Sequence, residues 1–373
     1  MSLLKIPASE IPKFRRRLLS WFAKRKRDLP WRRTSDPYRI WLSEIMLQQT
    51  RVAAVIPYYE RFLEAFPDVS ALAGAEAERV LTNWAGLGYY SRARNLQSAA
   101  KEIVARHAGQ FPREYEAALA LPGIGRYTAA AVLSIAYAAP YAVLDGNVAR
   151  VFARIGALRG DLRAPAAWRK LEAAAQDLLA RTAPGDWNQA LMELGATVCT
   201  PKSPRCEECP VEKWCRARRL GLQEKLPAAR VKRATVAVTI AAAVLLDPRG
   251  RTLLVRLPGD EGALFSRMWQ FPALETTGTE ASAALAAHLH ENFGLAVNGN
   301  LTPLAPARHT VTFRAIRLEP YLVRVAHLPR VKGARIATLS EISSMSISNA
   351  TRKIVGQASS LSGFDFSPEF NIR

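Results

Sequence analysis

Four cysteines are the residues whose type and spacing point most directly to chemistry. They are Cys199, Cys206, Cys209 and Cys215, and the 373-residue chain has no others. Four thiolates in one short loop can surround a single metal centre, whereas a cytosolic protein rarely keeps disulfides. The spacing therefore predicts a metal site, but it does not distinguish zinc from a [4Fe–4S] cluster, because both accept four cysteine ligands.

Two carboxylates, Glu44 and Asp145, stand in surroundings that could give them different protonation states. Apolar residues crowd Glu44 within the segment 41–47. Partial desolvation should raise the pKa of Glu44 and keep a proton available near neutral pH, unless Glu44 is a surface residue of an amphipathic helix. Asp145 precedes a predicted helix over residues 148–158 and could also cap it. A protonated acid and an ionised carboxylate divide the work in glycoside hydrolysis.

The segment 121–129 has the pattern of a tight turn between two helices. Pro122 ends the first helix, and Gly123 and Gly125 permit a turn with positive φ. Backbone N–H groups at the start of the next helix, around Arg126, would then bind a phosphate without reading sequence. The pattern predicts a helix-hairpin-helix over residues 115–138 that contacts DNA, with an ordinary helix–helix corner as the alternative.

The charge balance also favours a nucleic-acid partner. The chain has 52 Lys and Arg against 32 Asp and Glu, a formal charge of +20. Such a surplus favours a polyanion, although a merely basic, well-solvated surface is the alternative. No apolar run approaches the roughly 20 residues that span a bilayer. The start of the chain lacks the pattern of a secretory signal. We therefore expect no membrane association and a cytoplasmic, bacterial-type protein that works at the nucleoid.

Two types of sequence pattern divide the chain into two predicted domains. An all-α domain is expected over residues 1–217, because Ala and Leu dominate it and Pro or Gly breaks recur. A basic stretch over 218–233 is the expected linker. An α+β domain is expected over 234–373, with strands at 235–246 and 251–255, a helix at 281–293, and strands near 310–318 and 320–325.

The first 220 residues resemble the adenine DNA glycosylases of the MutY family, which share a helix-hairpin-helix fold with endonuclease III. The segments that carry the likeness are residues 29–32, 44–51 and 84–92, the hairpin, the Asp145 loop and the cysteine loop. The order of cysteine spacings over residues 199–215, six, two and five intervening residues, resembles the cluster loop of these enzymes. The resemblance thus implies a [4Fe–4S] cluster held by all four cysteines.

The resemblance also implies a role for each site residue. Glu44 would protonate adenine and later position water, and Asp145 would stabilise the sugar cation or trap it covalently. Tyr127 and Asn147 would support these two carboxylates. The walls of the pocket for the extruded base would be Trp31, Arg32, Leu47 and Glu193. DNA contacts would come from Gln49, Thr50 and Tyr89. Gln49 and Tyr89 would insert into the DNA double helix and fill the space that the extruded base leaves. Ordinary core packing is the alternative for Tyr89.

Tyr127 separates this chain from some of its relatives. Endonuclease III-like enzymes carry at this position a lysine whose amine forms a Schiff base and nicks the strand. A phenol cannot do so, and we expect a monofunctional, monomeric enzyme that removes adenine opposite 8-oxoguanine or guanine from double-stranded DNA. The alternatives are a mismatch thymine or oxidised-pyrimidine glycosylase, and a non-catalytic DNA-binding module. The module would leave Glu44 and Asp145 unexplained.

Residues 234–373 resemble the Nudix-like domain of the family, through the segments 253–256 and 268–272. A catalytic Nudix helix needs several glutamates for Mg²⁺, and Glu291 is the only one in the segment 285–294. The resemblance therefore implies lesion recognition without pyrophosphohydrolase activity. The family's Phe-Ser-His strand corresponds to residues 309–314. Thr312 takes the place of the serine that would bind 8-oxoguanine, and Phe313 that of the histidine.

Overall fold

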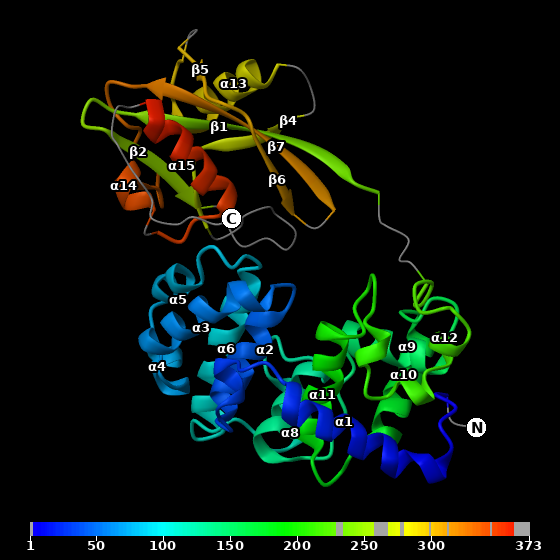
Figure 1. Cartoon of the computed structure of the whole chain (residues 1–373). Coiled ribbons are helices and arrows are strands. Elements are labelled where there is room, and N and C mark those ends of the chain that lie inside the picture. The colour runs from blue at the N-terminus through cyan, green and yellow to red at the C-terminus, as the bar shows by residue number, and fades with distance from the viewer. Residues whose placement is uncertain are drawn as a thin grey trace. The chain divides into compact units, whose positions relative to one another are not determined.

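The chain forms two compact units (Figure 1). The computed structural model describes residues 3–228, 234–256, 268–276, 280–297, 300–311, 313–343 and 345–361. The first unit comprises Met1–Ala75 and Ser91–Val231, and the second comprises Glu76–Tyr90 and Lys232–Arg373. The segment Glu76–Tyr90, which we placed in the first domain, thus belongs to the second unit by its contacts.

The first unit is built from helices and short 3₁₀ turns, which confirms the predicted all-α class. Its α-helices are α1 (Ile11–Arg25), α2 (Pro37–Leu47), α3 (Val52–Ala65), α4 (Val69–Gly74), α6 (Ser91–Arg106), α7 (Tyr115–Ala120), α8 (Arg126–Tyr137), α9 (Gly146–Gly156), α10 (Pro165–Leu178), α11 (Pro184–Thr197) and α12 (Arg216–Arg219). The 3₁₀ turns are η1 (Ala8–Glu10), η2 (Pro30–Arg32), η3 (Cys206–Glu208) and η4 (Glu212–Trp214).

Helix α1 shows how the basic N-terminal sequence folds. Phe14, Leu18 and Phe22 recur every four residues and are buried on one face. They join one core with Phe152 of α9 and Trp187 of α11. The intervening arginines and lysines lie outside this apolar stripe, so the helix keeps a basic outer face while it supports the helices that carry the site.

The segment expected as an interdomain linker, 218–233, begins inside the first unit. Residues 218 and 219 complete α12. The buried Leu226 has a carbonyl that accepts a hydrogen bond from Nε of Arg154 at 2.9 Å. The first unit therefore holds the chain at least as far as Leu226, and residues 229–233 lie outside the described part.

The second unit has the expected α+β composition. Its helices are α5 (Ala77–Trp84), α13 (Ala281–Phe293), α14 (Leu339–Ile342) and α15 (Asn349–Leu361). Its strands are β1 (Val236–Leu246), β2 (Arg251–Arg256), β3 (Trp269–Gln270), β4 (Ala273–Thr276), β5 (Thr302–Pro303), β6 (Ala307–Val311), β7 (Arg314–Arg324) and β8 (Arg335–Thr338). No helix among the described residues is long and apolar enough to cross a membrane.

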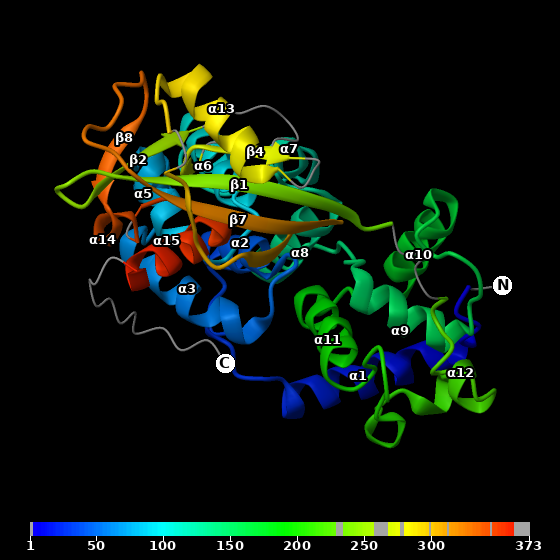
Figure 2. The same ribbon diagram turned by 90° about the horizontal axis from the view of Figure 1, so that it is seen from above.

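Two sheets form the centre of the second unit. The larger has the order β4-β1-β7-β5, with β6 also paired to β7, and the smaller has the order β3-β2-β8. Strands β1 and β7 are parallel throughout, from Val236 opposite Arg314 to Leu246 opposite Arg324. Helices α13 and α15 lie on opposite sides of this pair (Figure 2). The sequence of β1 is almost continuously apolar, which suits a strand covered on both faces.

Two strands are present near the predicted ranges 310–318 and 320–325, but the predicted bounds are wrong. Strand β6 ends at Val311, which pairs with Arg314, so residues 312 and 313 connect β6 to β7. Strand β7 then continues through Pro320, which lies opposite Ala242. Proline does not interrupt the strand here, because its carbonyl still accepts a hydrogen bond from the Leu304 amide at 2.9 Å and its fixed φ suits extended backbone.

Candidate active site and metal centre

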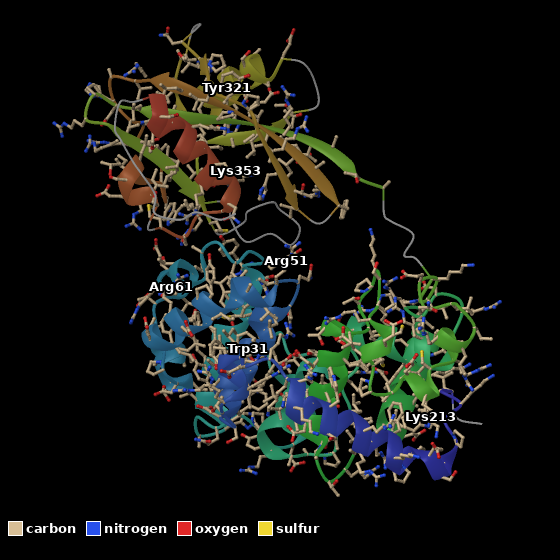
Figure 3. The ribbon with its side chains drawn as sticks, in the orientation of Figure 1. Trp31, Arg51, Arg61, Lys213, Tyr321 and Lys353 are labelled. Atoms are coloured by element: carbon tan, nitrogen blue, oxygen red, sulfur yellow. The ribbon has the colours of Figure 1, made fainter. Side chains whose placement is uncertain are left out.

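A cavity of about 860 Å³ in the first unit brings together the residues predicted for catalysis and for the base pocket. The predicted residues that line it are Trp31, Arg32, Glu44, Leu47, Gln49, Thr50, Gly125, Tyr127, Asp145, Asn147 and Glu193. They come from η2, the end of α2, and helices α8, α9 and α11. Trp31, labelled in Figure 3, packs edge-on against Tyr59 at 5.4 Å between ring centroids. The volume of the cavity is within the ordinary range for a pocket that binds a small molecule or a base.

Glu44 lies on α2 with only 7% of its surface exposed, which confirms the expected desolvation. Burial raises the pKa of Glu44 to about 7, and the nearby charge of Asp145 acts in the same direction. A hydrogen bond from the Tyr127 hydroxyl to Oε2, 2.7 Å long, opposes this shift. Glu44 therefore holds a proton for a substantial fraction of the time at neutral pH, as a general acid must.

The Tyr127 hydroxyl is placed to orient Glu44. It lies on the first turn of α8, 2.7 Å from Oε2 of Glu44 and 3.0 Å from Sδ of Met192. Burial raises the pKa of Tyr127 well above its ordinary value, and the charges of Glu44 and Asp145 raise it further. The phenol thus stays protonated at neutral pH and serves as a hydrogen-bonding group.

Asp145 combines the capping and active-site positions that the sequence left as compatible readings. Its Oδ1 accepts from the Val148 amide at 2.7 Å at the start of α9, and its Oδ2 accepts from Nδ2 of Asn147 at 2.9 Å. Burial raises the pKa of Asp145, whereas these hydrogen bonds lower it. Because donors surround Asp145 and Glu44 has mainly apolar neighbours, Asp145 is the member of the pair that ionises first.

Arg150 connects the Asp145 loop to the cysteine loop, and sequence reasoning missed it. Its Nη2 donates to Oδ1 of Asn147 and to the Gly195 carbonyl, both at 2.8 Å, and its Nε donates to the Cys199 carbonyl at 2.8 Å. The spacing of three residues from Asn147 on one helix was the available signal. A Cβ added at Gly195 would lie 2.7 Å from Cβ of Asn147, so this approach of α11 to α9 requires glycine.

Glu193 is fully buried and lies between two arginines. It accepts from Nε and Nη2 of Arg27 at 2.8 and 2.7 Å, and from Nη2 of Arg32 at 2.9 Å. Burial alone would raise the pKa of Glu193, but the hydrogen bonds from Arg27 and Arg32 outweigh it and lower the pKa to about 2. The predicted pocket wall is therefore a permanently charged cluster. Arg27 is a further residue that the sequence analysis did not assign.

Gln49 and Thr50 follow α2 in a strained turn. Gln49 has a φ of 58°, in the region that residues other than glycine rarely adopt. Arg92 supports this turn, because its guanidinium donates to the carbonyls of Ile45, Met46 and Gln48 at the end of α2. A side chain of α6 thereby satisfies carbonyls at the end of α2 that have no partner within their own helix. The turn that follows places its residues at the cavity.

The predicted hairpin ends at a helix N-terminus that has no side-chain cap. Gly123 has a φ of 76°, and Gly125 is the N-cap of α8 with no side-chain cap. Arg126, at the first position of α8, is paired weakly with Glu172 at 3.4 Å.

Tyr89, in the second unit, has a φ of 50° and is 41% exposed, so it is not an ordinary core residue. Thr312 lies outside the described residues.

The four cysteines lie together at one site, as the ligands of one iron–sulfur cluster would. All four are free thiols that line one cavity together with Arg154. Among the described residues, no three Cys, His, Asp or Glu side chains are arranged to hold one metal ion. Burial raises the pKa of Cys209 to about 12, so a thiolate there needs a strongly positive partner. The buried Arg154 donates to Cys199 Sγ at 3.3 Å and to the Thr200 carbonyl at 2.6 Å.

Protein purified aerobically should be yellow-brown. Thiolate-to-iron charge transfer in a [4Fe–4S] cluster gives broad visible absorption, which an absorption spectrum with iron and sulfide analysis will detect. A Cys209→Ser variant should lose most of the colour. A colourless preparation with stoichiometric zinc would contradict the cluster assignment.

Comparison with known proteins agrees with both parts of the first unit. Residues 42–179 match the family described as HhH-GPD superfamily base excision DNA repair protein. Residues 199–215 match the iron–sulfur binding domain of endonuclease III. The second match includes all four cysteines and confirms the predicted [4Fe–4S] centre.

The sequence relatives include adenine DNA glycosylases from several organisms. The chain is 48% identical to that of Homo sapiens over 227 residues, which are 58% of this chain and 42% of the relative. It is 45% identical to that of Mycolicibacterium smegmatis over 217 residues, 58% of this chain and 73% of the relative. The match spans about half the length of the human and Arabidopsis thaliana relatives, 42% and 52%.

Solved structures resemble the first unit in fold. A thermostable thymine-DNA glycosylase is 29% identical with a TM-score of 0.52, and covers 57% of this chain and 98% of its own. A trapped endonuclease III–DNA covalent intermediate is 22% identical with a TM-score of 0.50, and covers 58% and 99%. With an identity of 45% to a relative of which it covers 73%, and with the shared repair-domain match, this chain belongs to the adenine DNA glycosylase family.

Proposed function

We propose that this protein is a monofunctional DNA glycosylase that extrudes adenine from mispaired DNA and hydrolyses its N-glycosidic bond. The observation that carries the proposal is the pair of unlike carboxylates in one cavity. Glu44 has a pKa raised to about 7, and Asp145 accepts two hydrogen bonds that favour its ionised form. Family membership supports the choice of adenine as the base.

The two carboxylates would divide the reaction between the base and the sugar. Adenine leaves poorly as an anion, so Glu44 would give its proton to the ring as the bond breaks. The ionised Asp145 would stabilise the positive charge that develops on the sugar. Tyr127 holds Glu44 in place, and Asn147 holds Asp145. Water would then complete the hydrolysis, with Glu44 positioned to accept a proton from it.

The rate of excision should fall as the pH rises through about 7. The acid form of Glu44 is the active one, and burial sets its pKa at about 7, so the active fraction decreases about tenfold per pH unit well above that value. Single-turnover excision between pH 6 and pH 9 will measure this, with DNA affinity at each pH as the control. A flat profile up to pH 9 would contradict the assignment of Glu44 as the acid.

Base removal should leave the DNA strand intact. Tyr127 stands at the position of the lysine nucleophile, and no lysine is among the described residues that line the cavity. Strand breaks should therefore appear only after alkali or heat, and borohydride should trap little covalent adduct. Efficient trapping by borohydride would reveal an amine nucleophile and refute the monofunctional mechanism.

A mismatch thymine glycosylase is the second candidate, because the solved thymine-DNA glycosylase shares the fold of the first unit at 29% identity. An excision assay on duplexes that pair A or T with G, 8-oxoguanine, C and T distinguishes the two. Release of adenine opposite 8-oxoguanine and guanine supports the proposal. Release of thymine without adenine refutes it.

We propose that the second unit reads the opposite base, in the manner expected for a Nudix-like recognition domain. The connection between β6 and β7 contains Thr312 and Phe313. Phe313 is anchored there, since its carbonyl accepts from the Val236 amide at 2.9 Å. Thr312 would hydrogen-bond 8-oxoguanine and give a preference for A opposite 8-oxoguanine over A opposite G. The protein is further proposed to act as a monomer in the cytoplasm, at the nucleoid.

A further inference from the structure

The segment Glu76–Tyr90 combines helix α5 with the loop that carries Tyr89, and it packs with residues 232–373. It is covalently continuous with the first unit at both ends, through Ala75 and Ser91. Its position in the second unit means that residues 232–373 can determine its conformation. Two sets of contacts hold the segment, one at α5 and one at the loop.

Glu78 of α5 makes the first set of contacts. Its Oε1 accepts from Nε1 of Trp269 at 3.1 Å and from Nη1 of Arg335 at 2.9 Å. Arg256 lies 3.7 Å from Oε2 of Glu78 and 4.2 Å from the Trp269 ring centroid. A single exposed ion pair contributes little to stability. Here three donors from β2, β3 and β8 converge on one carboxylate, which fixes the position of α5.

Tyr90 and Asn349 make the second set of contacts, at the loop itself. The Tyr90 hydroxyl donates to the Ile347 carbonyl at 3.0 Å and accepts from the Gly86 amide at 3.2 Å. Nδ2 of Asn349 donates to the Gly86 carbonyl at 3.5 Å. The Trp269 amide donates to the Ser346 carbonyl at 3.0 Å, so the segment that contacts Tyr90 is hydrogen-bonded to the residue that contacts Glu78.

The loop between these anchors is held in an unusual backbone conformation. Gly86 and Gly88 have φ values of 101° and 76°, and Tyr89 has a φ of 50°. Nε1 of Trp84 donates to the Gly88 carbonyl at 3.1 Å. A residue other than glycine persists in the left-handed region only where its surroundings determine it. The result is an exposed tyrosine at the end of a tightly bonded loop.

We propose that residues 232–373 hold the Tyr89 loop in the conformation that inserts into DNA, with Glu78 and Tyr90 as the positioning residues. The inference rests on the proposed function, since insertion matters only if a base is extruded. It gives the second unit a role in extrusion that is separate from reading the opposite base. The loop would thus work as part of the second unit, although the residues before and after it in the sequence belong to the first unit.

The test uses the full chain with Glu78→Ala and Tyr90→Phe, separately and together. Glu76→Ala is the matched control, because it removes a carboxylate from the same helix terminus and Glu76 makes no side-chain cap contact. Hydrogen exchange of the peptide 84–90, measured without DNA, should become about fivefold faster in each variant and remain unchanged in the control. Fluorescence of 2-aminopurine at the target position should report less base extrusion at equal thermal stability.

Two outcomes would overturn the proposal. Unchanged exchange in the double variant would show that the contacts of Glu78 and Tyr90 do not hold the loop. Faster exchange with undiminished 2-aminopurine fluorescence would show that the contacts do not serve insertion. Failure of the wild-type protein to extrude or excise a base would instead refute the proposed function, and the exchange measurement would still decide whether residues 232–373 hold the loop.

Discussion

Replacement of Glu44 by Gln should lower single-turnover adenine excision by about 10²- to 10⁴-fold, the range that a positioned general acid contributes. Glutamine keeps the shape of the side chain and can still accept a hydrogen bond from Tyr127, but it has no acidic proton to give the base. Because Glu44 is buried and uncharged for much of the time at neutral pH, the substitution also removes little charge from the cavity.

The fold and the affinity for mispaired DNA should survive the Glu44→Gln change. Thermal denaturation and a binding titration on an uncleaved duplex will test this. Glu64→Gln, on the exposed side of α3, is the matched control and should excise at the wild-type rate. A Glu44→Gln enzyme with near-native single-turnover rates would refute the acid role, whereas loss of folding would be evident from the melting curve.

Replacement of Asp145 by Asn should reduce excision to a comparable extent, for a different reason. The substitution removes the negative charge that faces the developing sugar cation, and loss of one preorganised electrostatic group costs about 10²- to 10³-fold in known cases. The Asn oxygen can still cap α9 by accepting from the Val148 amide, so the helix should remain intact. The loss should therefore be confined to the chemical step.

Asp68→Asn is the appropriate control for this second variant. Asp68 caps α4 by accepting from the Ala71 amide at 2.8 Å, with no part in the cavity. The Asp68→Asn substitution also removes one negative charge from a helix cap, but it leaves the active-site cavity unchanged. If Asp145→Asn retained near-native single-turnover rates while Asp68→Asn behaved as wild type, a charge beside the sugar would not be required.

The sequence predicted those parts of the site that depend on local pattern. Gly123 and Gly125 mark the hairpin because a tight turn needs their φ freedom, and the four cysteines mark the metal centre because their spacing is local. Apolar residues next to Glu44 along α2 predicted its burial. In each case neighbours in sequence are also neighbours in space, and the physical cause can be read from one short segment.

Long-range arginine contacts could not be predicted in this way. Arg27 meets Glu193 across 166 residues, and Arg92 meets the end of α2 across more than 40. Arg150 gave a partial signal through its spacing from Asn147, but its bonds to the Gly195 and Cys199 carbonyls depend on how α11 packs. The placement of Glu76–Tyr90 with the second unit likewise depends on tertiary contacts, which no local sequence pattern predicts.

The charge cluster at Glu193 determines how the acid side of a rate profile can be interpreted. With a pKa of about 2, Glu193 stays ionised through the ordinary range of an activity assay. The pKa of Asp145, in contrast, is raised towards that range by burial. Because Glu193 keeps its charge, we expect a decline in rate on the acid side to come from protonation of Asp145 and not of Glu193.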